Sequence, residues 1–380
     1  MRVVHCCLSN FYIDDYTYQE NMLIHKHVEM GCDVLVLAST ETYNSELRLD
    51  YLNPSEYIGS EGARVIRVPY SSILPFFLMK KIRAYSGVID ILENFKPDVI
   101  MFHGPCAWEL LVVTKYVKRH GIKLYVDSHE DKNNSARSWI SYILLYKFFY
   151  VPIIRKCRKY VNKFLYISYE SKLFCNNIYG LSDAELEFYP LGGIVFDDLE
   201  YKNRRSKSRC ELDINADDIV FFQSGKFDKK KKLLQSLEAF KKTSASNVRL
   251  VIAGGFDEEI ACKALELIHS DKRIRYLGWV DPEQLQDLLC CADVYVQPGS
   301  QSATLQMSIC ARCAVIIDDV ISHRFIIKDN GFFVKNNKDL QQAYQDLIES
   351  PTKIAEMSRF SLEYAKENLD YQKLADRLLR

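Results

Sequence analysis

Two basic side chains in the C-terminal half stand where they could bind a diphosphate. Gly225 and Lys226 follow an apolar run, and Lys231 comes five positions after Lys226, before a helical pattern. A glycine lets the backbone approach a ligand closely, and two ammonium groups could grip one diphosphate from two sides. A solvated basic turn before a helix has the same composition. A second anion-suited segment on the same sheet edge would favour the first interpretation.

Such a segment lies between a strand predicted over residues 294–296 and a helix predicted from Leu305. Its polar side chains are Ser300, Gln301, Ser302 and Thr304. Free N–H groups and the helix dipole favour an anion at a helix N-terminus, although Ser and Thr also cap ordinary helices. Because both segments follow strands of one predicted parallel sheet, we expect them to meet at its carboxyl edge as a diphosphate site.

In the N-terminal half, one imidazole stands among three carboxylates. The run Asp127-Ser-His-Glu-Asp follows a predicted strand and contains His129, Glu130 and Asp131. Histidine can hydrogen-bond a sugar hydroxyl or transfer a proton near neutral pH. One histidine beside acids lacks the spacing of a transition-metal site, so we expect no metal here.

Three further polar residues fall at neighbouring loops of the same half. His103 ends a predicted strand, where it either contacts a substrate or only closes the strand end. Asp14 and Glu20 surround the first loop. Acids there would repel a phosphate, so they favour a neutral hydroxylated substrate or cap the following helix.

The elements that would position these side chains alternate between strands and helices. In the first half, helices are predicted over 18–30 and 80–94 and up to His120, and residues 41–62 are predicted to be irregular. The predicted strands are residues 2–8, 33–38, 64–68, 97–102, 123–126 and 164–168. Such alternation predicts a parallel sheet with helices on both faces.

A second alternation follows a polar stretch over 199–218, which we interpret as a linker near a domain boundary. Its strands are predicted over 219–222, 248–253, 274–277, 294–296 and 315–317. The sequence therefore predicts an α/β protein with two doubly wound domains, 1–195 and 196–368. For the last segment, 369–380, a helix that crosses back to the first domain is one option.

Composition restricts the class further. The 380 residues include 50 basic and 50 acidic side chains, so no general attraction to nucleic acid is expected. We find no signal peptide and no apolar run of membrane-spanning length, which favours the cytoplasm for a chain with twelve cysteines. The aromatic and basic stretch 139–163 fits either a helix docked on the inner face of a membrane or a packed helix with one solvated face.

The C-terminal half resembles the GT-B glycosyltransferases of family 4, through Gly225-Lys226 with Lys231, Gly278-Trp-Val280 and the run PGSQSATLQ. The N-terminal half resembles a bacterial branch of that family involved in capsule, exopolysaccharide and O-antigen assembly. The segments that carry this likeness are Tyr18-Gln-Glu-Asn21, Lys96-Pro-Asp98, His103-Gly104, Asp127-x-His129-x-Asp131 and Asn134-Ser-Ala136.

The resemblance implies two Rossmann-like domains that face a cleft, and transfer of a sugar from a nucleotide-sugar donor to a saccharide or lipid-linked acceptor. It also implies a UDP- or GDP-sugar donor, no further cofactor, no metal, and retention of the anomeric configuration. In that family the first basic residue and the lysine hold the donor diphosphate. Those roles fall on Lys226 and Lys231.

The expected site residues form three groups. The catalytic candidates are His129 and Lys231. The donor-binding candidates are Gly225, Lys226, Lys231, Val280, Ser300, Gln301, Ser302 and Thr304. The acceptor-side candidates are Asp14, Glu20, His103, Asp127, Glu130 and Asp131.

The chain departs from the family in the loop around residue 300. The family carries two glutamates there, but no glutamate occurs between Val294 and Val315, and Gln301 and Gln306 are the nearest amides. An amide cannot stabilise developing positive charge as a carboxylate does. A GT-B relative that binds nucleotide sugar without catalysis, and a sugar-nucleotide epimerase, therefore stay as alternatives. A nicotinamide dehydrogenase is disfavoured because the first βα turn lacks G-x-G-x-x-G.

Overall fold

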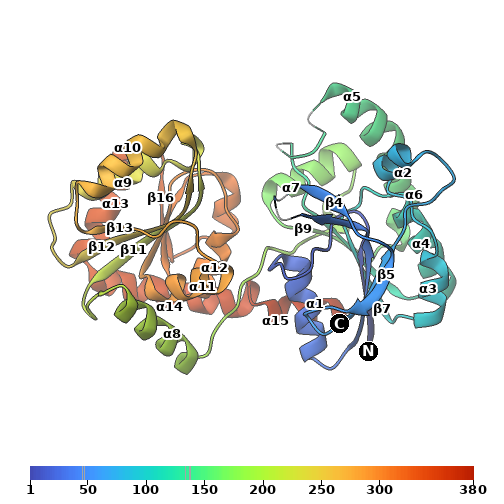
Figure 1. Cartoon of the computed structure of the whole chain (residues 1–380), viewed down its shortest axis with the longest axis horizontal. Helices are drawn as coiled ribbons and strands as arrows, with labels where there is room; N and C mark the ends of the chain where they lie inside the picture. Colours follow the sequence, from blue (N-terminus) through green and yellow to red (C-terminus); the bar gives the residue numbers. More distant parts are fainter. Residues whose placement is uncertain (45, 47, 133, 137) are drawn as a thin grey trace. The chain divides into compact units, whose positions relative to one another are not determined.

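The computed structural model describes residues 1–44, 46, 48–132, 134–136 and 138–380. The chain forms two compact units (Figure 1). Unit 1 comprises Met1–Pro190 and Tyr371–Arg380, and unit 2 comprises Leu191–Asp370. In each unit a mainly parallel sheet carries helices on both faces, so each buries its strands on two sides.

The main sheet of unit 1 has eight strands in the order β10-β9-β8-β7-β1-β2-β6-β5. All neighbours are parallel except β5 and β6. The strands are β1 (Arg2–Cys7), β2 (Asp33–Ser39), β5 (Ser55–Ile58), β6 (Arg64–Val68), β7 (Val99–His103), β8 (Lys123–Ser128), β9 (Lys163–Tyr166) and β10 (Leu186–Phe188). A separate hairpin joins β3 (Glu41–Tyr43) to β4 (Leu49–Tyr51).

The helices of unit 1 bring the two ends of the chain together. The last helix, α15 (Tyr371–Leu379), packs against α1 (Gln19–Glu29) and β7, so it belongs to unit 1. The other α-helices are α2 (Phe76–Ile82), α3 (Val88–Phe95), α4 (Glu109–His120), α5 (Trp139–Ser141), α6 (Val151–Cys157) and α7 (Tyr169–Phe174). A π-helix, η1 (Tyr142–Tyr150), joins α5 to α6.

Two predictions for unit 1 are wrong. The stretch 41–62 is not irregular, because it contains β3, β4 and β5. The single helix predicted over 80–94 is two helices, α2 and α3. Arg83 (φ 53°) ends α2 and Gly87 (φ 80°) precedes α3, and a left-handed residue stops a right-handed helix.

Unit 2 has six parallel strands in the order β13-β12-β11-β14-β15-β16. They are β11 (Ile219–Phe227), β12 (Val248–Phe256), β13 (Ile274–Tyr276), β14 (Val294–Gln297), β15 (Ala314–Asp318) and β16 (Gly331–Val334). The helices are α8 (Asp198–Glu211), α9 (Leu233–Lys241), α10 (Glu258–His269), α11 (Pro282–Cys291), α12 (Thr304–Cys310), α13 (Asn337–Glu349) and α14 (Pro351–Asn368).

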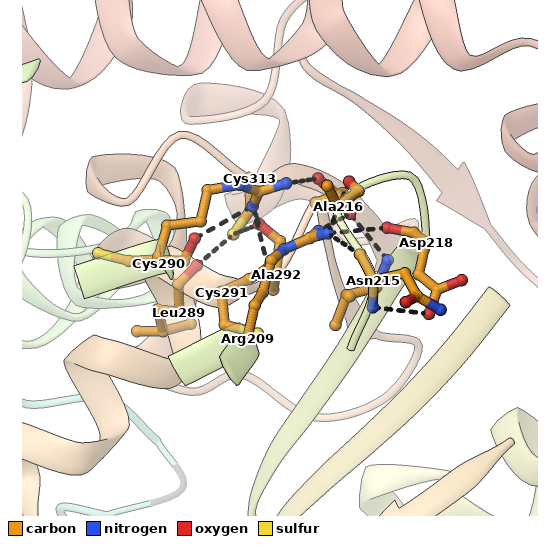
Figure 2. Close-up of polar contacts among 12 residues, drawn as sticks. Arg209, Asn215, Ala216, Asp218, Leu289, Cys290, Cys291, Ala292 and Cys313 are labelled. Carbon is orange, nitrogen blue, oxygen red and sulfur yellow. Dashed lines mark hydrogen bonds and ion pairs between the residues drawn. The ribbon is translucent and has the colours of Figure 1, made fainter. Parts of the chain in front are cut away.

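The stretch predicted as a linker, 199–218, is mostly helix α8, which packs on α11. Its arginines explain the difference, because they look solvated in sequence but are bound in the structure. Arg209 is buried and donates to the carbonyls of Asn215, Ala216, Asp218 and Cys291, as Figure 2 shows for these labelled residues. It also pairs with Asp293 at 2.8 Å.

Replacing Arg209 by alanine is expected to lower the unfolding free energy of unit 2 by about 3 kcal/mol. Removal of a buried, hydrogen-bonded cation leaves its partners unsatisfied in a poorly solvated place. Denaturant unfolding followed by circular dichroism measures the change. Lys207→Ala is the matched control, because this lysine is 62% exposed in its pair with Asp287 and should contribute less than about 1 kcal/mol. Equal effects of the two substitutions would contradict an anchoring role for Arg209.

Candidate active site

The carboxyl edge of unit 2 brings the two predicted anion-suited segments together. Ser300 donates its backbone N–H to the carbonyl of Lys230 at 2.9 Å. The ammonium of Lys231 donates to the carbonyls of Ser300 (3.1 Å) and Gln301 (2.7 Å). A Cβ at Gly299 would lie 2.0 Å from the Lys230 carbonyl oxygen, so only glycine permits this close contact.

Lys226 and Lys231 differ in their surroundings. Lys231 is half-buried, and burial lowers its pKa while Asp228 acts in the opposite direction. Lys226 is exposed and makes no hydrogen bond or ion pair within the described part of the chain. Gly225, which precedes it, has a φ of 139° at the end of β11 and lies opposite Gly254 of β12. The edge thus carries one positioned ammonium group and one that is free to move.

Ser302 and Thr304 lie at the start of α12 but do not cap it in the usual way. The N-cap residue is Ala303, whose side chain cannot accept a hydrogen bond, and Ser302 Oγ accepts from the backbone N–H of Thr304 at 3.4 Å. The hydroxyl of Ser302 also donates to Thr304 Oγ1 at 3.2 Å. Val280, the remaining donor-side candidate, is half-buried in the loop after β13, and Gly278 of that loop accepts from Gly254 at 2.7 Å. The Ser302 hydroxyl therefore contacts both the backbone and the side chain of Thr304 at the start of the helix.

Three buried amides at this edge were not assigned to the donor site from the sequence. Gln223 Oε1, Gln297 Nε2 and Gln306 Oε1 have no hydrogen-bond partner among the described residues. Gln297 ends β14, and Gln223 lies in the middle of β11, where its amide also donates to the carbonyl of Lys231 at 3.4 Å. Buried polar atoms are normally paired, so unpaired ones mark a place for a ligand or ordered water. The available signal was an amide at the end of an apolar strand, whereas Gln301, which we did select, is exposed.

In unit 1, Asp127 is the centre of a buried polar cluster. Parallel pairing places it opposite His103 at the ends of β8 and β7. It accepts from the backbone N–H of Gly104 and from His103 Nδ1, both at 2.7 Å, and His129 Nε2 lies 3.5 Å away. Burial alone would raise the pKa of Asp127, but His103 and His129 outweigh it and hold that pKa well below its usual range.

His129 is held as a cation by this carboxylate. Burial opposes the charged ring, yet the attraction of Asp127, supported by Glu20 and Glu130, raises the pKa of His129 to about 9. Its side chain is 27% exposed, so it can reach a ligand. At neutral pH such a ring donates hydrogen bonds and does not accept a proton, which limits it to a donor role.

His103 is buried and contacts no ligand space. Its Nε2 lies 3.0 Å from His5 Nδ1, and His5 Nε2 lies 2.9 Å from His27 Nδ1. His27 Nε2 lies 3.0 Å from the carbonyl of Ala375 in α15. The prediction that His103 contacts the acceptor is therefore corrected, because both of its nitrogens are already engaged and it acts through Asp127.

The number of protons on this row of three histidines follows from the groups at its two ends, the Ala375 carbonyl and the Asp127 carboxylate. A backbone carbonyl and an ionised carboxylate only accept, so the four contacts from Ala375 to Asp127 need four N–H groups. Three neutral imidazoles supply three N–H groups. One ring is therefore an imidazolium. Burial and the neighbouring histidines lower the pKa of His5, and burial lowers that of His27 to about 4.

A cavity of about 390 Å³ in unit 1 opens beside His129 and Glu130. Glu130 accepts from the hydroxyl of Ser128 at 2.6 Å, and burial raises its pKa. The rest of the lining is Asn10, Phe11, Glu41, Lys80, Lys81, Arg83, Cys106, Asn134, Ser135, Ser141, Leu145, Tyr146 and Tyr150. None of the basic residues in this lining was selected from the sequence, because they lie in a segment that was predicted as one unbroken helix.

The other acceptor-side candidates lie apart from this lining. Asp14 pairs with Arg67 at 2.7 Å and accepts from the hydroxyl of Tyr57 at 2.8 Å, so it is corrected to a structural role in the first loop. Asp131 forms a turn in which its carboxylate accepts from the N–H of Asn134. Glu20 is buried and acts on His129 only through its charge.

Two searches of the described residues found nothing. They contain no cluster of three or more His, Cys, Asp or Glu side chains arranged to hold a metal ion. Within the same residues, no helix combines the length and the hydropathy needed to span a membrane.

Residues 204–367 match the family model described as Glycosyl transferases group 1. The whole chain is also similar to solved structures. Sucrose-phosphate synthase from Thermosynechococcus elongatus superposes with a TM-score of 0.66 at 14% identity, over 100% of this chain and 97% of that one. A glycosyltransferase from Rickettsia africae gives 0.66 at 13% identity, over 100% and 96%. HepE of Anabaena in complex with UDP gives 0.64 at 12% identity, over 100% and 98%.

These likenesses confirm the predicted fold class, which is α/β and GT-B. At such low identity they establish the fold and no more. No curated protein matches the sequence.

The histidine chain can be counted by NMR. We expect the ring ¹⁵N signals of His5, His27 and His103 at pH 8 to show two neutral rings and one imidazolium. In Asp127→Asn, the amide supplies the fourth N–H to His103, so all three rings should become neutral. Three neutral rings in the unmodified protein would contradict the count.

The same substitution tests the charge of His129. Its pKa should fall from about 9 toward its ordinary value in Asp127→Asn, because the attracting carboxylate is lost. Since this pKa is raised on folding, the pair stabilises the protein fully below about pH 6.5, and that stability is lost as the pH rises through about 9. Thermal unfolding of both proteins across this range measures the difference.

Proposed function

We propose that the protein is a glycosyltransferase that moves a sugar from a nucleotide-sugar donor to a saccharide or lipid-linked acceptor. The observation that carries the proposal is the Lys231 loop joined to residues 300–301 at the carboxyl edge of a unit whose residues 204–367 match Glycosyl transferases group 1. Ligands of open α/β sheets bind at this edge.

The donor diphosphate is proposed to bind Lys226 and Lys231. Lys231 donates to two backbone carbonyls, so its ammonium is already positioned and only exchanges partners when an anion binds. Positive charge there stabilises the leaving nucleoside diphosphate and needs no metal. The hydroxyls of Ser302 and Thr304 and the amides of Gln297 and Gln306 are proposed to hydrogen-bond the rest of the donor.

The acceptor is proposed to bind the cavity of unit 1. His129 is the catalytic candidate there, as a charged donor to the transferred sugar or to an acceptor oxygen. Glu130 lines the same cavity with a raised pKa, which suits a group that takes the proton of the attacking hydroxyl. Retention of configuration is proposed from the family resemblance alone.

The donor nucleotide is proposed to be UDP or GDP. The structural relative HepE of Anabaena was solved with UDP and with UDP-glucose, which supports UDP first. A role in capsule, exopolysaccharide or O-antigen assembly, as a family 4 enzyme of the cytoplasm, rests on the motifs of the N-terminal half. WaaG, a glycosyltransferase of lipopolysaccharide biosynthesis, shares the fold at 15% identity with a TM-score of 0.62.

Peripheral contact with the inner face of a membrane is proposed for the segments around α2 and η1. Largely exposed apolar side chains gather there: Ile73, Phe76, Phe77, Trp139, Ile140, Leu144 and Phe148. The hydroxyl of Tyr150 donates to the carbonyl of Lys81, so the two segments are neighbours. Exposed Lys147, Arg155 and Lys156 add the positive charge that anionic lipid attracts.

A second candidate is a GT-B protein that binds nucleotide sugar without transferring it. The absence of any glutamate between Val294 and Val315 favours it. Incubation with labelled UDP- and GDP-sugars and a lipid-linked acceptor separates the two. Transfer that is greatly reduced in His129→Ala, with donor binding and thermal stability retained, supports the enzyme. Tight binding of UDP or GDP without turnover supports the second candidate.

Combined Lys226→Ala and Lys231→Ala substitutions should raise the dissociation constant for UDP at least tenfold, about 1.4 kcal/mol. The reason is loss of two charge-assisted contacts to the diphosphate. Isothermal titration calorimetry measures the affinity. Lys229→Ala serves as the matched control in the same basic run, because Lys229 is already paired with Glu259. Unchanged affinity in the double variant would remove the diphosphate assignment.

A further inference from the structure

The cavity of unit 1 has more positive charge than its acids neutralise. Three basic side chains of one segment line it, Lys80, Lys81 and Arg83. Lys80 is paired, since Glu41 lies 3.7 Å away and the ring of Tyr51 lies under its ammonium. Lys81 and Arg83 form no ion pair with any carboxylate in the described part of the chain. The cavity therefore presents two cations that have no ion-pair partner among the described residues.

Arg83 is held in place for this purpose by its backbone and by two oxygens. It ends α2 with its backbone in the left-handed region (φ 53°, ψ 60°), which residues other than glycine rarely adopt. Its Nη1 donates to the hydroxyl of Ser9 at 2.6 Å and to the carbonyl of Cys106 at 3.2 Å. Both partners are uncharged, and the carboxyl of Glu130 acts on the fixed guanidinium only through space. Strain of this kind is retained where the geometry has a use.

The acids of the lining do not cancel these charges. Glu41 is engaged by Lys80, which leaves Glu130 as the one other carboxyl of the described lining. His129 adds a third positive group at the same cavity. A neutral sugar would leave Lys81 and Arg83 without partners, whereas a phosphate presents oxygens to both.

A second, mostly apolar cavity of about 530 Å³ shares two segments of its lining with the first cavity. Met79 and Ile82 of α2 line it, while Lys80, Lys81 and Arg83, which alternate with them, line the first cavity. Helix η1 is shared in the same way, with Phe149 on the apolar side and Tyr146 and Tyr150 on the polar side. The two cavities thus share α2 and η1, and one has a charged lining while the other suits a hydrocarbon chain.

We propose that the acceptor carries a phosphate that binds Lys81 and Arg83 beside His129, and that its hydrocarbon chain occupies the apolar cavity. This assignment rests on the proposed glycosyl transfer, because that reaction is what makes the bound compound an acceptor. Binding of a phosphate at Lys81 and Arg83 does not require turnover. The phosphate could belong to a lipid or to a soluble sugar phosphate. The adjoining apolar cavity favours the lipid.

Binding of octyl phosphate to the full chain tests the site. The titration is done with UDP present, or in Lys231→Ala if UDP does not bind, so that the edge of unit 2 does not contribute. We expect octyl phosphate to bind at least about tenfold more tightly than octyl glucoside, and affinity to fall at least about tenfold in Lys81→Ala with Arg83→Gly. Glycine suits the left-handed position, so Arg83→Gly removes the guanidinium without adding strain.

Lys115→Ala is the matched control, because this exposed lysine of α4 lines neither cavity. If the double variant is unstable by thermal unfolding, Lys81→Ala alone carries the test. Equal binding of octyl phosphate and octyl glucoside, or unchanged binding in the folded variant, would overturn the phosphate site. Inorganic phosphate distinguishes the sources, since binding as tight as that of octyl phosphate would overturn the lipid assignment. Failure of UDP binding would instead count against the proposed function alone.

Discussion

The buried carboxylate of Asp127 is the interaction on which unit 1 depends. An ionised carboxylate without water needs positive and N–H partners, and the register of β7 and β8 supplies them from Gly104 and His103. The same need places an extra proton on the histidine chain and keeps His129 charged at the rim of the cavity. Because the row of hydrogen-bonded histidines ends at the carbonyl of Ala375, the last helix contributes to the electrostatics of the site as well as to packing.

The candidate site of unit 2 is held together differently, by close contacts between backbone segments. Gly299 lies against Lys230 and Gly254 against Gly225, at separations that no side chain would allow. These contacts bring two loops, from the ends of β11 and β14, within reach of one ammonium group, that of Lys231. The amount of movement required to bind an anion is then small, which is what preorganisation means in physical terms.

The sequence predicted most strands of both sheets, because apolar runs between loops are a local pattern. It also predicted the meeting of Lys231 with Ser300 and Gln301, since both loops follow strands of one parallel sheet. It could not predict helix α8, whose arginines find buried partners only after folding. Nor could it predict that His103 turns toward His5 and away from the cavity, because His5 and His27 lie far from it in sequence. Arg83 was missed for the same reason, as its role depends on a break between α2 and α3.

Both candidate sites are positively charged, although the formal net charge of the whole chain is zero. In unit 1, Asp127 is paired with histidines and Glu41 with Lys80. In unit 2, no glutamate occurs between Val294 and Val315, and the buried amides of Gln297 and Gln306 carry no charge that would oppose Lys226 and Lys231. Local positive potential at both places attracts anions at moderate ionic strength while the protein as a whole stays neutral. An edge of amides and ammonium groups favours a bound anion, whereas stabilisation of developing positive charge needs a carboxylate.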